Sequence, residues 1–242
     1  MEVLPVKKMV TYGLTVCIIG AAVIQFCFWE SRTVSVLVME ELRSNQHRVV
    51  IDPGHGGIDG GATSCTGKLE SSYNLEIGLR LRDLLHLLGY PTRMIRTTDT
   101  SIYTKGETIA AQKVSDLKER VRITNESEQQ ILVSIHQNNF SDSRYSGAQV
   151  FYGTTHGSKL LAEALQSSLV TSLNPGSTRS AKKAEGIYLM EHIQVPGVLV
   201  ECGFLSNSEE EAKLRTPDYQ HKLCCVIAAT VADFMERGYA NT

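Results

Sequence analysis

Ionisable residues close three apolar runs of this 242-residue sequence. His55 follows the run in VVIDPGHGG, His136 follows the run in LVSIHQNN, and Glu201 ends the run in VLVECGF. Short apolar runs of about four to eight residues are typical of buried strands. In α/β sheets, ligands bind at the carboxyl ends of the strands. We therefore expect these three side chains to meet at one edge of a sheet, where core packing alone does not require them.

Two imidazoles and carboxylates that converge in this way are the ligand set of a catalytic zinc site, in which water takes the open position. The chemistry needs neutral histidine nitrogens, one charged oxygen on the metal and a further carboxylate that takes the proton of the water. Glu70 and Glu201 are the candidates for the two carboxylate roles. Spacing does not assign them, because the sequence has no compact metal motif such as HExxH.

The glycines around His55 do not form a phosphate-binding loop. Asp59 stands where the dinucleotide fingerprint needs glycine, and the P-loop pattern fails at Ala62 and at Leu69. Glycine tolerates backbone conformations that other residues avoid. The glycines at 54, 56 and 57 therefore predict an unusual backbone path that turns His55 inward.

The elements that must position these residues alternate between strand-like and helix-like segments. The predicted strands are residues 49–52, 92–95, 131–135, 148–152 and 198–201. The predicted helices are residues 71–88, 117–125, 159–173 and 219–235. This alternation predicts an α/β fold: a single domain with a mostly parallel mixed sheet covered by helices on both faces.

An apolar segment precedes this domain. Residues 9–29 carry no charge, follow Lys7 and Lys8, and have roughly the length that a helix needs to cross a bilayer. The run stays apolar beyond its small residues, which favours an uncleaved N-terminal anchor helix over a cleaved signal. The predicted organisation is a signal or membrane-anchor segment at 1–29, a linker at 30–46 and a globular domain at 47–242.

Four motifs carry a resemblance to a known family. In order, VVIDPGHGGIDGGA, LESSYN, SIHQNN and VECGFLSN closely resemble the zinc-dependent N-acetylmuramoyl-L-alanine amidases of bacterial cell walls, the type-3 amidase family. The resemblance covers residues 47–236. LKERVRITNES, RSAKKAEGIYLMEHIQVPGVLVECGFLSN and the N-terminal apolar segment are similar to the germination-specific amidases of endospore-forming bacteria.

Carried over position by position, the resemblance implies that His55, Glu70 and His136 hold Zn²⁺ and that Glu201 is the catalytic base. It makes residues 47–242 a zinc amidase catalytic domain. The implied reaction cleaves the amide bond between the lactyl group of N-acetylmuramic acid and L-alanine of the peptidoglycan stem peptide by zinc-activated water. Asn139 stands where many relatives have a small residue, which concerns the local substrate contacts.

The narrower resemblance implies a place in spore formation. The substrate would be spore-cortex peptidoglycan, and peptide removal would be the first step toward muramic lactam, which needs a separate deacetylase in the same pathway. The protein would be exported across the cytoplasmic membrane, held to it by the N-terminal segment, and located in the intermembrane cortex layer of the developing spore. An activating protein partner is also expected. A net charge of only -2 gives no reason to expect nucleic acid as a partner.

Two other classes of function stay open at the sequence level. A thiol-dependent wall hydrolase would use Cys65 or Cys202 with a histidine. A non-catalytic peptidoglycan-binding protein would tolerate Glu201→Gln. For Cys65 and Cys202 we favour small buried side chains over a disulfide. We interpret the basic residues Arg179, Lys182 and Lys183 as a solvated loop and the remaining histidines as structural or solvent-facing: His47, His86, His156, His192 and His221.

Overall fold

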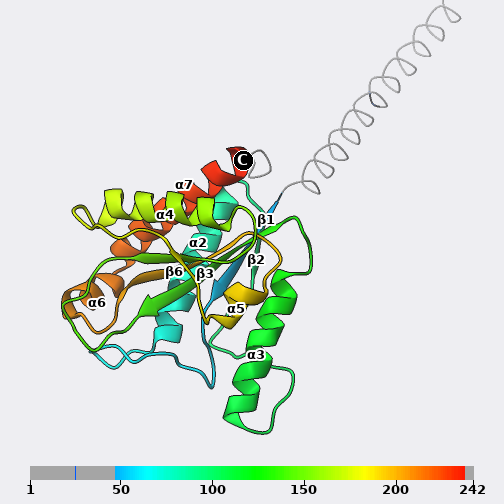
Figure 1. The fold of residues 1–242 in the computed structure, drawn as a ribbon, viewed down its shortest axis with the longest axis horizontal. Coiled ribbons are helices and arrows are strands. Elements are labelled where there is room, and N and C mark those ends of the chain that lie inside the picture. The colour runs from blue at the N-terminus through cyan, green and yellow to red at the C-terminus, as the bar shows by residue number, and fades with distance from the viewer. Residues whose placement is uncertain (1–24, 26–46, 238–242) are drawn as a thin grey trace, which may run out of the picture. The chain divides into compact units, whose positions relative to one another are not determined.

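The computed structural model describes Gln25 and residues 47–237, which contain a six-stranded sheet and its covering helices (Figure 1). The strands are β1 (Arg48–Pro53), β2 (Thr92–Met94), β3 (Gln130–Asn138), β4 (Gln149–Tyr152), β5 (Lys182–Lys183) and β6 (Gly197–Phe204). The helices are α2 (Glu70–Leu87), α3 (Ile109–Thr124), α4 (Ser158–Leu173), α5 (Tyr188–His192), α6 (Ser208–Leu214) and α7 (Pro217–Arg237).

The predicted anchor at 1–29 and linker at 30–46 lie outside the described residues, apart from Gln25. Within the described part of the chain, no helix combines the length and the apolar character that crossing a membrane requires.

The sheet has the order β2-β1-β3-β6-β4-β5. Its pairs are parallel, except that β4 runs antiparallel to β6. A mostly parallel sheet needs cover on both faces, because its strands are apolar on both sides. The predicted single α/β domain with a mostly parallel mixed sheet is confirmed.

Two apolar cores flank the sheet (Figure 1). The larger core packs α2, α4 and α7 against one face, through residues such as Ile77, Leu165 and Ile227. The smaller core packs α3 and α5 against the other face and takes one residue from each of three central strands: Val50, Leu132 and Leu199. The predicted cover on both faces is therefore confirmed.

Strand alternation decides which polar side chains reach the smaller face. Successive residues of a strand point to opposite faces, so every second residue shares a face. Asp52 and Glu201 each lie two residues beyond the smaller-core position of their strand, in β1 and β6. His136 lies four residues beyond that position in β3. These three side chains therefore lie on the face that α3 and α5 cover.

Every strand and helix predicted from the sequence occurs, but β3 and β6 continue three residues beyond the predicted ends. His136 and Glu201 consequently lie inside strands rather than at their ends, and they are register partners. The sequence QNN after His136 indicates a loop because it is polar. In the structure, Gln137 is buried and its side-chain nitrogen donates to Asn74 Oδ1 at 3.2 Å, so a tertiary hydrogen bond accompanies the continued strand.

Helix α3 begins eight residues before its predicted start, at Ile109. Its first turns show no apolar stripe facing a core, since Ile109 and Val114 are exposed. Hydrogen bonds define this segment instead: Thr108 Oγ1 accepts from Ala111 N–H at 3.2 Å, and Ser115 Oγ accepts from Thr104 N–H at 3.1 Å. The short elements α5, α6 and β5 were not predicted, because they are too brief to show a hydrophobic period.

Candidate metal centre

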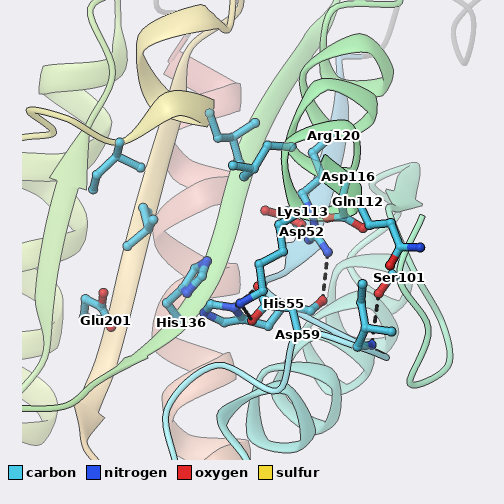
Figure 2. Close-up of a pocket in the computed structure, with 16 residues that line it drawn as sticks. Asp52, His55, Asp59, Ser101, Gln112, Lys113, Asp116, Arg120, His136 and Glu201 are labelled. Atoms are coloured by element: carbon cyan, nitrogen blue, oxygen red, sulfur yellow. Dashed lines mark hydrogen bonds and ion pairs between the residues drawn. The ribbon is translucent and has the colours of Figure 1, made fainter. Parts of the chain in front are cut away.

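Three residues from separate elements form a group that could hold a metal ion: His55, Glu70 and His136. His55 follows β1, Glu70 is the first residue of α2, and His136 lies in β3. One nitrogen or oxygen from each lies within 4.8 Å of the others. One carboxylate oxygen of Glu70, Oε2, lies 3.3 Å from His55 Nε2, and the other, Oε1, lies 2.9 Å from His136 Nδ1. The imidazole rings are edge to face with centroids 4.9 Å apart. Figure 2 shows His55 and His136 side by side in the pocket.

The backbone around His55 follows the unusual path that the glycines predict. His55 has a φ of 61°, in the left-handed region, which costs a residue with a side chain roughly 1–2 kcal/mol. Gly54 is needed for a different reason, because a Cβ there would lie 2.1 Å from His136 Nε2. The absence of a side chain at Gly54 therefore lets the β1 loop pass directly over the second imidazole.

Two buried arginines donate hydrogen bonds to the backbone carbonyls of this loop. Arg96 donates to the carbonyls of Pro53 and Gly54 at 2.8 and 3.0 Å. Arg120 of α3 donates to the carbonyl of His55 at 2.8 Å and pairs with Asp52. Burial and the neighbouring Arg120 lower the pKa of Arg96 to about 10. The backbone strain at His55 is thus maintained by charged donors that bind the loop carbonyls.

Asp52 and Arg120 form a buried ion pair in which each charge stabilises the other. Burial favours the neutral form of the Asp52 carboxyl, but Arg120, His136 and Ser134 together outweigh burial and hold the pKa of Asp52 below its usual value. Ser134 Oγ also donates to Asp52 at 2.7 Å. The attraction within a buried ion pair and the hydrogen bonds to its remaining oxygens offset the desolvation penalty, which a lone buried charge would carry uncompensated.

The ligand side chains are oriented by a second set of contacts. Asp59 accepts from His55 Nδ1 at 2.9 Å and forms an ion pair with Lys113 of α3 at 2.8 Å. This contact directs the other ring nitrogen, Nε2, toward Glu70. Glu70 in turn accepts from Ala62 N–H at 2.9 Å. Outer contacts of this kind are typical of metal-binding histidines and carboxylates.

The pKa values of the group reflect its direct contacts. Burial opposes a positive charge on His55, but hydrogen bonds to Glu70 and Asp59 outweigh it and raise the pKa of His55 to about 9. Burial likewise favours a neutral Glu70, yet its hydrogen bonds with His136 and His55 hold the pKa of Glu70 well below the usual value. A metal ion and protons would therefore compete for the same nitrogens.

Glu201 faces this group from the neighbouring strand, as the register partner of His136. Its Oε2 is buried and has no hydrogen-bond partner among the described residues. Burial, reinforced by the Glu70 charge and opposed by the histidines, raises the pKa of Glu201 to about 7. A carboxyl group with a pKa near the working pH is suited to general acid-base catalysis.

A cavity of about 340 Å³ lies beside the candidate metal centre, and Figure 2 shows the side chains that line it. His55, His136 and Glu201 line it, together with apolar side chains from α3 and the α5 region, such as Leu117 and Leu189. Two imidazoles, one carboxylate and an adjacent unpartnered carboxylate fit a catalytic zinc ion, which takes three protein ligands and leaves one position for water.

Sequence reasoning missed the residues that support the group: Asp59, Arg96, Lys113, Arg120 and Asn74. The Asn74 amide donates to the carbonyl of Gly54 at 3.1 Å and to Glu70 Oε1 at 3.3 Å. Only Asp59 left a signal, because it follows His55 at a spacing of four residues in the same motif. Arg96 and Arg120 come from distant segments, and nothing in their local sequence places them under the β1 loop.

Among the described residues, the cysteines and the remaining histidines do not join the centre. Cys65, Cys202, Cys224 and Cys225 are free thiols, and neither Cys65 nor Cys202 lines the cavity. The expectation of a buried side chain holds for Cys202 and is wrong for Cys65, which is exposed. Burial raises the pKa of Cys202 well above its usual value, which suppresses the thiolate that a thiol hydrolase needs. The described residues contain no metal group that includes another histidine.

Known proteins resemble this chain over its whole globular part. Residues 49–233 match the family described as N-acetylmuramoyl-L-alanine amidase, Amidase_3. The germination-specific N-acetylmuramoyl-L-alanine amidase of Bacillus subtilis (strain 168) is 40% identical over 194 residues, which cover 78% of this chain and 81% of that protein.

Solved structures agree with this match. The CwlD amidase from Clostridioides difficile, in complex with the GerS lipoprotein, superposes with a TM-score of 0.76 at 34% identity, covering 80% of this chain and 100% of that one. An N-acetylmuramoyl-L-alanine amidase from Clostridium difficile 630 gives a TM-score of 0.69 at 31% identity, covering 79% of this chain and 98% of that one. The chain therefore belongs to the N-acetylmuramoyl-L-alanine amidase family, Amidase_3.

Proposed function

We propose that this protein hydrolyses the amide bond between the lactyl group of N-acetylmuramic acid and L-alanine of the stem peptide. In this proposal His55, Glu70 and His136 hold Zn²⁺ and Glu201 is the catalytic base. The main support is that ligand atoms of these three residues lie within 4.8 Å of one another. Beside them, a buried oxygen of Glu201 has no hydrogen-bond partner among the described residues.

The chain's own residues would act on water and substrate as follows. When bound, zinc supplies Lewis acidity toward the lactyl carbonyl and lowers the pKa of a water. Glu201 accepts a proton from the water whose oxygen attacks the carbonyl carbon. Glu201 then gives the proton to the nitrogen of L-alanine as the C–N bond breaks, which leaves a lactyl carboxylate and a free amine. Asp59 holds His55 in the tautomer that presents Nε2 to the metal.

The spore-cortex role belongs to the same proposal. Its support is the 40% identity to a germination-specific amidase. Removal of the stem peptide would prepare muramic acid for conversion to its lactam, a step that needs a separate deacetylase. A protein partner that favours zinc binding or substrate access is also proposed, since the CwlD amidase of C. difficile was solved in complex with the GerS lipoprotein.

The location follows from the substrate. Cell-wall peptidoglycan lies outside the cytoplasmic membrane, and we propose that residues 1–29 direct export and anchor the chain. Residues 30–46 would then link the anchor to a catalytic domain at 47–242, in the intermembrane cortex layer of the developing spore.

The test measures zinc content and the release of stem peptide from purified peptidoglycan by the full chain. Wild type is expected to bind about one zinc and to cleave. Glu201→Gln is expected to keep zinc and lose at least about 100-fold in rate, because it removes the proton acceptor. His136→Ala is expected to lose both zinc and activity.

Three results would contradict the proposal. Cleavage by Glu201→Gln at the wild-type rate would exclude Glu201 as the base. A zinc-free wild type that cleaves peptidoglycan in the presence of a chelator would exclude the metal reaction. Peptidoglycan binding by Glu201→Gln without cleavage by wild type would instead support a binding protein.

A further inference from the structure

Two exposed aromatic rings stand in the loop between β3 and β4, which Figure 1 shows beside α6. Phe140 and Tyr145 are 51% and 47% exposed, and their ring centroids lie 5.0 Å apart in an edge-to-face pair. Phe140 N–H donates to Ser206 Oγ at 3.2 Å, and Asn207 Nδ2 donates to the carbonyl of Tyr145 at 3.2 Å. The rings are thus held in place against the β6–α6 connection, and we name Phe140 and Tyr145 the aromatic shelf.

A series of side-chain contacts connects the aromatic shelf with the strands around the candidate base, Glu201. The Tyr145 ring stacks on Phe204, the last residue of β6, with centroids 6.1 Å apart. The Arg179 guanidinium lies over the Phe204 ring, 5.2 Å from its centroid, and donates to Gln149 Oε1 at 3.3 Å. Gln149 is the register partner of Glu201 in β4. The aromatic shelf is therefore connected to the strand that lies next to Glu201.

The separation between the aromatic shelf and the metal centre suits a chain of sugars. Phe140 follows His136 by four residues, so the backbone between them spans at most about 14 Å. The strands that carry His136 and Glu201 also end together, since Asn138 pairs with Phe204. A sugar polymer whose reacting unit lies at the centre would extend past this end of the two strands.

A hollow of about 640 Å³ opens beside Tyr145. Its wall includes five residues with polar side chains: Ser146, Asn174, Ser177, Thr178 and Arg179. Hydroxyl, amide and guanidinium groups supply both donors and acceptors, as the hydroxyl and acetamido groups of an N-acetylated sugar require. A pyranose ring also has an apolar C–H face, which an exposed aromatic ring can cover. The aromatic shelf and the hollow together offer the two kinds of contact that a sugar needs.

We propose that the aromatic shelf and the adjoining hollow bind N-acetylated sugars of the glycan strand, next to the muramic acid that loses its stem peptide. This subsite rests on the proposed function, because it takes its ligand from the proposed substrate. The stem peptide is the weaker candidate for an occupant, since its carboxylates would need a free cation. Arg179, which lines the hollow, already donates to Ser146 and Gln149 and covers Phe204.

The experiment measures binding of the full chain to peptide-free glycan strands in a Glu201→Gln background, where cleavage plays no part. Replacing both rings, by Phe140→Ala with Tyr145→Ala, is expected to weaken binding about tenfold. Tyr145→Phe keeps the ring and is expected to bind as the parent does. Leu160→Ala is the matched control, because Leu160 is 44% exposed on α4 and lies outside the proposed subsite.

A second arm uses the cleaving enzyme. The double alanine variant is expected to lower the ratio of kcat/KM on glycan strands to kcat/KM on a single N-acetylmuramoyl peptide by about tenfold. Unchanged glycan binding, or an equal loss on both substrates, would overturn the subsite. Weaker binding of free stem peptide with unchanged glycan binding would assign the surface to the peptide and overturn it as well. A failure of the proposed function appears separately, as glycan binding by a wild type that does not cleave.

Discussion

His55 is held in a strained conformation by groups that lie outside its own loop. Its φ of 61° is accompanied by one side-chain hydrogen bond within the loop, to Asp59, and the loop carbonyls are fixed by Arg96 and Arg120. Strain of this kind persists only where the surrounding structure determines the backbone. The imidazole is consequently placed against Glu70 before any metal arrives, which reduces the entropy lost on binding.

Gly54→Ala tests this close placement. A Cβ at position 54 would lie 2.1 Å from His136 Nε2, so the His136 imidazole would be displaced from its place beside Glu70. We expect zinc affinity to fall about tenfold or more, measured by titration against a competing chelator. Gly60→Ala is the control, since its Cβ would meet only the end of the Leu69 side chain at 3.0 Å. Equal zinc affinities in two folded variants would show that His136 does not bind the metal from this position.

At the scale of elements, α3 serves both as cover for the sheet and as a support for the site. Arg120 projects from it to the carbonyl of His55 and to Asp52, while Asp116 accepts from Arg120 Nε at 2.5 Å. The helix therefore joins the end of β1 through charged groups, although its own apolar contacts are few.

Arg120→Met removes that connection and leaves Asp52 as a buried charge without its cation. We expect the free energy of unfolding to fall by about 3–5 kcal/mol, measured by urea denaturation. Adding Asp52→Asn should recover part of the loss, because the second change removes the unpaired charge. Arg122→Met in the same helix is the control: Arg122 is exposed, and we expect a much smaller loss than for Arg120→Met because water screens its ion pairs. A loss that the second change does not reduce would contradict the ion-pair account.

At the scale of the whole molecule, the centre couples protonation to folding. The metal-free native state raises the pKa of Glu201 from its usual 4.5 to about 7, so the folded chain binds this proton more tightly than the unfolded chain does. The contribution of Glu201 to stability is therefore complete below about pH 4.5 and is lost as the pH rises through about 7.

We compare the free energy of unfolding of metal-free Glu201→Gln with that of metal-free wild type at two pH values. From about pH 4 to about pH 8, we expect this difference to shift by about 2–3 kcal/mol in favour of Glu201→Gln. Urea denaturation in the presence of a chelator at both pH values measures this change. Glu163→Gln, an exposed change on α4, is the matched control. If the difference between wild type and Glu201→Gln is the same at both pH values, the raised pKa is wrong.

The sequence by itself determined the α/β alternation, the mostly parallel sheet and the residue types of the centre. Periodicity is a local property, so helices such as α2 and α4 were predicted within one residue of their ends. The motif around His55 also indicated its unusual backbone, because three glycines flank it. The polar end of β3 and the start of α3 escaped prediction, because hydrogen bonds rather than apolar spacing mark them: Gln137 bonds to the distant Asn74, and Ser115 bonds to Thr104 in the preceding loop.

Only the tertiary structure decided how the two candidate carboxylates are placed. Glu70 contacts both histidines, whereas Glu201 stands opposite His136 with one oxygen unpartnered among the described residues. It also brought Arg96 and Arg120 to the carbonyls of the β1 loop, and it stacked Tyr145 of the aromatic shelf on Phe204, the last residue of the strand that carries Glu201. The reason is that strand register and helix packing join residues far apart in the chain, and no local pattern records which partners will meet.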